Sequence, residues 1–378
     1  MTRIGVVGFY GHSNSGDEAM AAVCLTELSQ RIHNSMIFVP CRPLVMPREL
    51  DVCWQPLARP WKRPLQRERR LCKGRCDALV FGGGSVFSDL KGIDSLELRY
   101  RRVSGFRKRG TRVAAIGVSI GPLMTPKGRA IAKSLLEQFE IVVVRDIESM
   151  RVATELGLAN AVQGFDVAVL LDEIGLPEPP RSTPQHKEKR TLGLAICNYS
   201  QYVGRGYKPD LARLNKIETA LHSTDWTGWR LSLLALGGHP RAGDLFIASH
   251  LQNSLRKTVE CEVVAHHPNP LLMLRRVGSC DAFVSMRLHG AVYAFTAERP
   301  FGILTYHPKC AGFAEMVRLP KELLLDSETF TPQDLHRLLA CLMAEPAKPS
   351  ALLPLAEAKG LARLGLERVA EAVPGERQ

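Results

Sequence analysis

Three glycine-rich turns in the first half of the chain have residue types suited to binding an anion. They span Gly8–Met20, Phe81–Asp89 and Gly117–Pro122, and each begins at the end of a short apolar run. Glycine lets a ligand approach the backbone closely, and free N–H groups at a helix start bind carboxylates and phosphates. In the first turn, helix capping by Asn14 and Asp17 is the structural alternative. Three such turns at strand ends of one sheet favour a ligand, and their spacing disfavours generic NAD binding.

A positively charged residue is predicted at the same rim of this sheet. Arg145 directly follows the apolar run 141–144 and is a candidate ligand for a carboxylate or phosphate. The structural alternative is an ion pair between Arg145 and Asp146 or Glu148.

A histidine in the second half of the chain occupies a comparable position. His289 and Arg287 lie in the segment Ser285–Ala291, which ends a predicted strand and opens a predicted helix. The positive end of the helix dipole disfavours a protonated histidine, so an anion beside His289 is needed to keep it charged. Taken alone, such a histidine is more often structural than catalytic.

The elements that must position these residues alternate between strand and helix, which predicts an α/β fold with doubly wound parallel sheets. We expect two Rossmann-like domains in a GT-B-like arrangement with a central cleft, because 378 residues are too many for one ordinary core. The expected parts are an N-terminal domain (1–180), a Pro-rich linker (181–190), a C-terminal domain (191–349) and a C-terminal helix (350–378). Strands are expected at 4–7, 37–39, 78–81, 113–116, 141–144, 191–196, 230–235, 261–265, 282–285 and 301–305.

The composition restricts the partners and the compartment. The formal net charge of +12 indicates an anionic partner, and much of it comes from the runs Arg59–Arg75 and Arg99–Arg112. Solvated helix and loop faces, an anionic substrate and an acidic membrane surface stay open as explanations. The 6% aromatic content and the absence of a nucleic-acid-binding motif argue against nucleic acid. The ten cysteines form no CxxC pair, so we expect reduced thiols and no metal site.

No apolar run reaches the roughly 18 to 20 residues of a membrane helix. The N-terminus becomes a Gly-punctuated strand at once and has no signal-peptide pattern. We therefore expect a cytoplasmic protein, with peripheral contact at the inner face of the membrane as an open alternative.

The motifs in their order along the chain resemble the polysaccharide pyruvyl transferases. Each motif alone is weak, whereas the six together, spread over Ile4–Leu319, are specific. They are Asn14–Ala19, Gly82–Ser85, Ser119–Pro122, Arg145–Ser149, Met286–His289, and Tyr306–Lys309 with Phe313.

This resemblance implies transfer of the pyruvyl group of phosphoenolpyruvate to a sugar of a bacterial surface polysaccharide or its lipid-linked precursor, giving a pyruvate ketal. Arg145 matches the basic residue thought to bind phosphoenolpyruvate, and His289 matches the histidine thought to act in protonation. Phosphoenolpyruvate is then the donor substrate, the saccharide acceptor is lipid-linked or nucleotide-linked, and no cofactor is implied. The expected substrate-binding residues are Asn14, Gly16, Asp17, Glu18, Gly83, Gly84, Ser85, Ser119, Arg287 and Lys309.

Two other functions stay open. A GT-B glycosyltransferase or sugar-nucleotide epimerase would share the fold and a histidine in the cleft. A non-catalytic saccharide-binding subunit is favoured if Arg145 or His289 is buried and paired. The acceptor contacts around Pro177–Pro209 follow no family pattern, and the oligomeric state is open.

Overall fold

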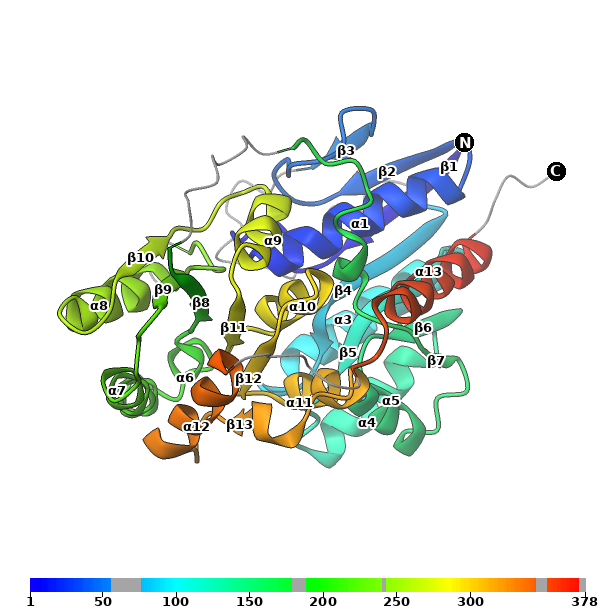
Figure 1. The fold of residues 1–378 in the computed structure, drawn as a ribbon. Helices are drawn as coiled ribbons and strands as arrows, with labels where there is room; N and C mark the ends of the chain where they lie inside the picture. Colours follow the sequence, from blue (N-terminus) through cyan, green and yellow to red (C-terminus); the bar gives the residue numbers. More distant parts are fainter. Residues whose placement is uncertain (56–75, 179–187, 240–242, 345–351, 374–378) are drawn as a thin grey trace. The chain divides into compact units, whose positions relative to one another are not determined.

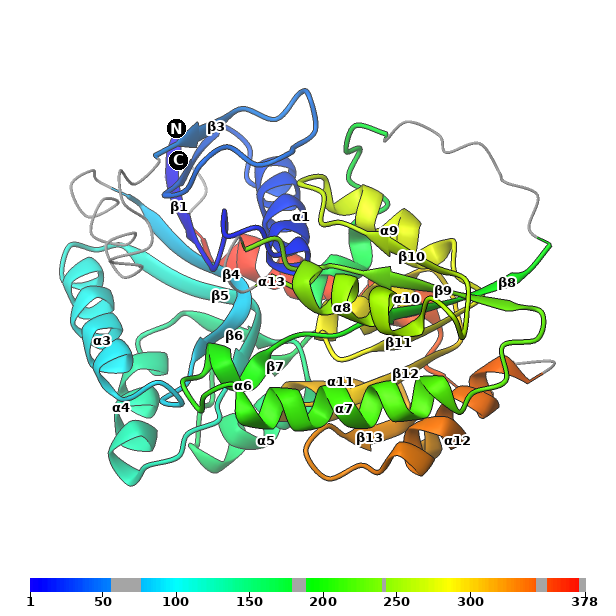
Figure 2. The ribbon, with the colours of Figure 1, turned by 90° about the vertical axis from the view of Figure 1, so that its left-hand side faces the viewer.

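The computed structural model describes residues 1–55, 76–178, 188–239, 243–344 and 352–373, which form two compact α/β units (Figure 1 and Figure 2). Unit 1 comprises Met1–Gly11, Asp17–Pro177 and Ala356–Gln378, and unit 2 comprises His12–Gly16 and Glu178–Leu355. The first basic run, Arg59–Arg75, and residues 181–187 of the expected linker lie outside the described residues.

Unit 1 is built on a 7-stranded parallel sheet whose apolar strands are buried by the surrounding helices. The strand order is β3 (Val52–Trp54), β2 (Ser35–Val39), β1 (Thr2–Val7), β4 (Ala78–Phe87), β5 (Arg112–Ile120), β6 (Ile141–Val144) and β7 (Ala161–Gln163). The helical segments are α1 (Ser15–Arg31), α3 (Asp94–Arg107), α4 (Pro126–Leu136), α5 (Ile147–Glu155), η1 (Val167–Leu170) and α13 (Leu355–Ala372).

Unit 2 is built on a 6-stranded parallel sheet. Its strand order is β10 (Cys261–Val264), β9 (Trp229–Leu234), β8 (Arg190–Ala195), β11 (Ala282–Ser285), β12 (Phe301–Thr305) and β13 (Leu324–Asp326). The helical segments are α6 (Tyr199–Tyr202), α7 (Lys208–His222), α8 (Leu245–Leu255), α9 (Pro270–Gly278), α10 (Leu288–Thr296), α11 (Pro308–Met316), η2 (Lys321–Leu323) and α12 (Pro332–Met343).

The two sheets share one topology, with the first strand of each unit inside the sheet. In unit 1, β2 and β3 lie on one side of β1 and the later strands lie on the other, so the direction in which strands are added reverses between β1 and β4. In unit 2 the same reversal occurs between β8 and β11. Ligands of doubly wound sheets bind beyond the carboxyl ends of the strands at such a reversal. The prediction of two Rossmann-like α/β domains is confirmed, and the topology indicates one such position in each unit.

A short piece of the first glycine turn packs within unit 2. Asn14 forms an isolated antiparallel bridge with Gly237, and the amide of Ser15 donates to the Leu236 carbonyl at 3.0 Å. The Tyr293 hydroxyl, which is fully buried, donates to the Ser15 carbonyl at 2.9 Å. These contacts fix the turn to the carboxyl end of β9.

The C-terminal helix α13 packs within unit 1. Lys359 on α13 forms ion pairs with Asp172 and Glu173 at 3.0 and 2.9 Å. Gly365 is so close to β6 that a Cβ atom there would lie 2.8 Å from Cγ1 of Val143. A side chain at this position would therefore separate the helix from the sheet.

The second basic run, Arg99–Arg112, falls mainly on α3. This helix buries Leu96, Val103 and Phe106, while Arg101 and Arg107 are exposed and Arg99 and Arg102 are half-buried. Among the described residues, no helix is long and apolar enough to cross a membrane.

Candidate functional site

An arginine and an aspartate form the charged centre of unit 2 beyond the carboxyl end of β11. The guanidinium of Arg287 donates from Nε and Nη2 to the two carboxylate oxygens of Asp244, at 2.5 and 2.6 Å. Asp244 is 1% exposed and also accepts the Gly237 amide at 2.8 Å. Burial lowers the pKa of Arg287, but attraction to Asp244 outweighs it and the net pKa is raised. The guanidinium is therefore charged and held in one orientation.

His289 lies in the first turn of α10, two residues after Arg287, and its side chain is partly exposed. Its ring packs directly on the backbone of Gly16: a Cβ atom at position 16 would lie 1.9 Å from both Cγ and Nδ1 of His289. Only glycine leaves room for the imidazole at this place. Gly16 of the first turn thus positions His289, the candidate general acid. The sequence did not indicate this contact.

An aromatic group stands beside the Arg287–Asp244 pair. The rings of Tyr306 and Tyr199 have their centroids 4.4 Å apart, and the Lys309 ammonium lies 5.4 Å from the Tyr306 ring centroid. Burial raises the pKa of the Tyr306 phenol, and Arg287 lowers it in part. The phenol is therefore a neutral donor at physiological pH, and Lys309 brings a second positive charge to this side of unit 2.

Arg145 forms a buried network in unit 1. Its Nη1 donates to Asp166 at 2.9 Å and its Nε donates to the Ser119 hydroxyl at 2.9 Å. The guanidinium is 2% exposed. Asp146 lies 4.0 Å from Nε and uses its other oxygen to cap α5 through the Ser149 amide at 2.8 Å. Arg145 is thus held by Asp166, with Ser85 at 3.5 Å from Nη2 on the exposed side.

The glycines predicted to form a second turn lie inside β4, and Gly117 of the third predicted turn lies inside β5, so the prediction that these two segments are turns at strand ends was wrong. Gly83 and Gly84 have φ of +90° and +91°, in the left-handed region that favours glycine. A Cβ at Gly83 would lie 2.6 Å from the Met20 sulfur, the same sulfur that accepts from Nη1 of Arg145 at 3.3 Å. This part of β4 therefore packs closely against α1, and Ser85, near the carboxyl end of the strand, is exposed.

The expected site residues fall into two groups, one in each unit. Asn14, Gly16, Arg287, His289 and Lys309 belong to unit 2, and Asp17, Glu18, Gly83, Gly84, Ser85, Ser119 and Arg145 belong to unit 1. Sequence reasoning missed the two aspartates that hold the arginines, Asp166 and Asp244. The sequence could have indicated Asp244, because this residue follows a glycine-rich segment after the predicted strand 230–235. Within the described ranges, no three His, Cys, Asp or Glu side chains are grouped as a metal site would require.

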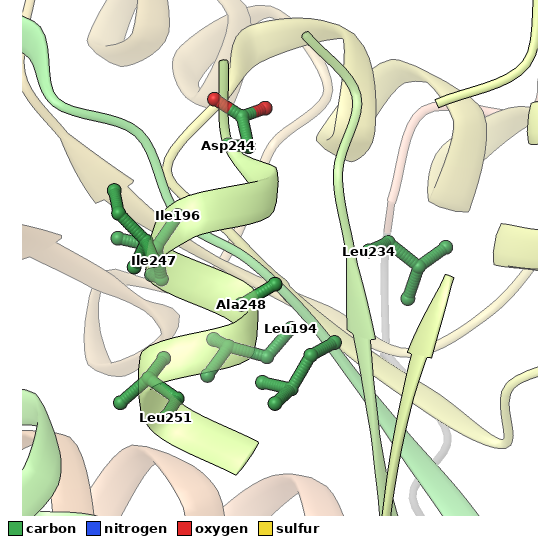
Figure 3. Close-up of a pocket in the computed structure, with 8 residues that line it drawn as sticks. Leu194, Ile196, Leu234, Asp244, Ile247, Ala248 and Leu251 are labelled. Carbon is green, nitrogen blue, oxygen red and sulfur yellow. The ribbon is translucent and has the colours of Figure 1, made fainter. Parts of the chain in front are cut away.

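A small apolar space lies under Asp244 in unit 2, between α8 and the strands β8 and β9 (Figure 3). Leu194, Ile247 and Leu251 contribute to its walls, and its volume is about 10 Å³. This is near the lower limit for one water molecule. The space is a packing gap and is too small for a substrate.

Solved structures with the same architecture include enzymes that act on nucleotide sugars. The UDP-bound MnaA structure from S. aureus has a TM-score of 0.65 at 12% identity, covering 100% of both chains. The HepE structure from Anabaena with UDP-glucose has a TM-score of 0.59 at 9% identity, covering 98% of both. UDP-GlcNAc 2-epimerase from Neisseria meningitidis has a TM-score of 0.58 at 12% identity, covering 98% of this chain and all of that one. These similarities define the class as GT-B-like, with two parallel α/β domains.

The family is narrower than the fold. Residues 14–308 match the polysaccharide pyruvyl transferase family, and the chain belongs to it. Among curated proteins it is similar to the amylovoran biosynthesis protein AmsJ of Erwinia amylovora, at 21% identity over 254 residues. That alignment covers 65% of this chain and 60% of AmsJ.

Proposed function

We propose that this protein transfers the pyruvyl group of phosphoenolpyruvate to a sugar of a bacterial surface polysaccharide or its lipid-linked precursor and forms a pyruvate ketal. The observation that carries the proposal is the turn after β11, inside the family match. There a charged Arg287, fixed by Asp244, stands two residues before a partly exposed histidine at a helix start. The similarity to AmsJ, a protein of amylovoran biosynthesis, supports a role in polysaccharide synthesis.

The chemistry requires one acid and fixed positive charges. His289 protonates the methylene carbon of phosphoenolpyruvate, which creates an oxocarbenium-like centre at the neighbouring carbon. A sugar hydroxyl attacks that carbon and returns its proton to His289. The bond between that carbon and the phosphate oxygen breaks, phosphate leaves, and a second hydroxyl attacks the same carbon and gives its proton to the phosphate, which closes the ketal. Arg287 binds a carboxylate or phosphate oxygen during these steps.

Arg145 is proposed as the second ligand of the donor. Its guanidinium is engaged by Asp166 and Ser119, and Nη2 is directed toward the exposed Ser85 hydroxyl. A buried ion pair orients a guanidinium well, and an anion at Ser85 would lie beside a fixed charge. We also propose that substrate binding involves Asn14, Asp17, Glu18 and Lys309, which lie in the motifs shared with the family.

The burial of Arg145 also favours a second function, a non-catalytic saccharide-binding subunit. With 2% exposure and a full carboxylate partner, Arg145 has the geometry of a structural ion pair. His289 differs, because its side chain is partly exposed. The enzyme is the better-supported function since the proposed acid has access to a substrate.

We further propose a cytoplasmic enzyme with phosphoenolpyruvate as donor and no cofactor. The acceptor is a saccharide linked to a lipid or a nucleotide, and nucleic acid is not a partner.

A transfer assay tests the proposal. The purified chain is incubated with ¹⁴C-labelled phosphoenolpyruvate and candidate lipid-linked oligosaccharides, and in parallel with labelled nucleotide sugars. We expect label from phosphoenolpyruvate in the saccharide, with one phosphate released per ketal formed. Transfer or epimerisation of the nucleotide sugars, with phosphoenolpyruvate unused, would establish the glycosyltransferase or epimerase instead. Saccharide binding without turnover of either donor would establish the non-catalytic subunit.

Phosphoenolpyruvate should also stabilise the folded protein, because it binds the native site and not the unfolded chain. A melting temperature that does not move at saturating phosphoenolpyruvate, with or without acceptor, would contradict the proposed donor.

A further inference from the structure

A second cavity in unit 2 lies along one face of α7. It has a volume of about 270 Å³ and is bounded by α7, by the loop before that helix and by the residues after β13. Figure 2 shows α7 beside α6 and near β13. Cavities for drug-sized ligands start at about 300 Å³, so this groove suits a smaller group.

Basic side chains outnumber acidic ones in the walls of this α7 groove. Arg205, Arg213 and Lys216 line it, with Glu328 as the one acidic residue among its lining side chains. Arg205 and Glu328 form an ion pair at 3.0 Å, whose side chains are both 53% exposed. The Lys216 ammonium donates to the Glu328 carbonyl at 3.0 Å and lies 5.2 Å from the Phe330 ring centroid. Lys216 therefore has a fixed position and further N–H groups directed elsewhere.

Arg213 is a buried and hydrogen-bonded part of this wall. It is 3% exposed, and its Nε donates to the Ser327 carbonyl at 3.0 Å while Nη1 donates to Asp210 at 2.6 Å. Asp210 also accepts the amides of Ser200 and Gln201, at 3.0 and 2.8 Å. The Ser327 hydroxyl is buried and has no hydrogen-bond partner among the described residues.

The first turn of α7 also borders the groove. Pro209 lines it there and has no backbone N–H group to donate to a ligand. Arg205 and Lys216 therefore supply the charged N–H donors at the groove surface, and such donors match the oxygens of a phosphate group. The residues differ from those of the Arg287–His289 site.

We propose that the α7 groove is a binding site for a phosphate group, as carried by phosphorylated saccharides and by inorganic phosphate. Lys216 and Arg205 supply the charge that the ligand contacts, and Arg213 holds the wall in place. Glu328 competes with the ligand for Arg205.

Isothermal titration of the full chain with glucose 1-phosphate and with inorganic phosphate tests this site, with chloride at equal ionic strength as the reference. Lys216→Gln removes one charged donor and should weaken binding by about tenfold. Glu328→Gln removes the competing carboxylate and should strengthen binding severalfold. Tighter binding of glucose 1-phosphate assigns the groove to phosphorylated saccharides, and equal binding assigns it to free phosphate.

Two controls separate this site from general charge effects and from the proposed active site. Lys257→Gln removes an exposed lysine after α8, outside the groove, and should leave binding unchanged. Equal weakening by Lys216→Gln and Lys257→Gln would overturn the site. So would phosphate binding that is lost in Arg287→Ala and kept in Lys216→Gln, an outcome that leaves the pyruvyl transfer proposal intact. If Lys216→Gln lowers the melting temperature, Arg205→Gln, at an exposed position, replaces it in the same comparison.

Discussion

Arg287 and Asp244 face each other in unit 2 through two parallel hydrogen bonds, one from Nε and one from Nη2. The two residues are 43 positions apart, on the turns that follow β11 and β9. This geometry fixes both the plane and the direction of the guanidinium. Asp244 is therefore a positioning residue for the proposed donor-binding arginine.

Asp244→Asn should reduce turnover more than donor binding. The amide retains one acceptor but loses the charge and the second acceptor, so Arg287 stays in the site and loses its fixed orientation. Misplacement of about 1 Å costs about a hundredfold in rate. We expect kcat to fall toward that extent with KM for phosphoenolpyruvate within a few-fold of the wild type. Steady-state kinetics check this, and an unchanged kcat in a folded variant would show that Asp244 does not position Arg287.

Gly16→Ala should act through His289. The added methyl would lie 1.9 Å from the imidazole ring, so the ring must move. We expect kcat to fall in both Gly16→Ala and His289→Ala, in the latter by about a hundredfold to ten-thousandfold. Donor-induced shifts in melting temperature should persist in both. Near-normal turnover of folded His289→Ala would exclude this histidine as the acid.

Arg145 variants separate a donor ligand from a structural ion pair. Arg145→Ala leaves Asp166 buried without its partner, a change that costs about 3–5 kcal/mol of stability. Arg145→Lys keeps the charge but not the two-pronged contact. If Arg145 binds the donor, Arg145→Lys raises KM for phosphoenolpyruvate markedly. A lowered melting temperature with unchanged KM would assign Arg145 to the fold alone.

Two glycines of α13 should respond in opposite directions to alanine. Gly360 is exposed in the helix interior with open space around it, so Gly360→Ala should stabilise the protein by about 0.5–1 kcal/mol. A Cβ at Gly365 would lie 2.8 Å from Val143, so Gly365→Ala should destabilise it by about 1–3 kcal/mol. Urea unfolding of both variants measures the difference. Equal effects would contradict the packing of α13 on β6.

Stability should fall at alkaline pH because of a buried thiol. The pKa of Cys197 is raised from 9.0 to about 12, mainly by burial. Of the nearby charges, Arg287 lowers this pKa and Asp244 raises it. Above about pH 9 the unfolded chain loses this proton and the native state keeps it, so unfolding is favoured as pH rises. The contribution is at most about 1.4 kcal/mol per pH unit. Cys197→Ala should show a shallower loss of unfolding free energy than wild type, and parallel curves would refute the assignment.

The fold could be predicted from the sequence because its strands are short, apolar and buried on both faces. The expected strands at 78–81 and 141–144 fall within β4 and β6. Three strands were missed, Val52–Trp54, Ala161–Gln163 and Leu324–Asp326, because three residues give too little periodicity.

The partners of the charged residues could not be predicted in the same way. The structural alternative to donor binding was an ion pair of Arg145 with Asp146 or Glu148; Asp146 lies 4.0 Å from Nε and also caps α5, whereas Glu148 pairs with Arg151. The carboxylate that pairs most closely with Arg145 belongs to Asp166, which lies 21 positions away at the N-terminus of η1. Long-range pairs of this kind follow from tertiary packing, which residue spacing does not encode.

The exchange of segments between the units constrains how the chain can be assembled during synthesis. Unit 2 needs His12–Gly16, which are made first, and unit 1 needs α13, which follows unit 2 in the chain. Domains usually fold in the order in which the ribosome releases them. Here the hydrogen bonds of Ser15 with Leu236 and Tyr293 can form only after those two residues have been synthesised. The packing of Gly365 on β6 forms later still. Native structure in either unit is therefore completed only after most of the chain has been translated.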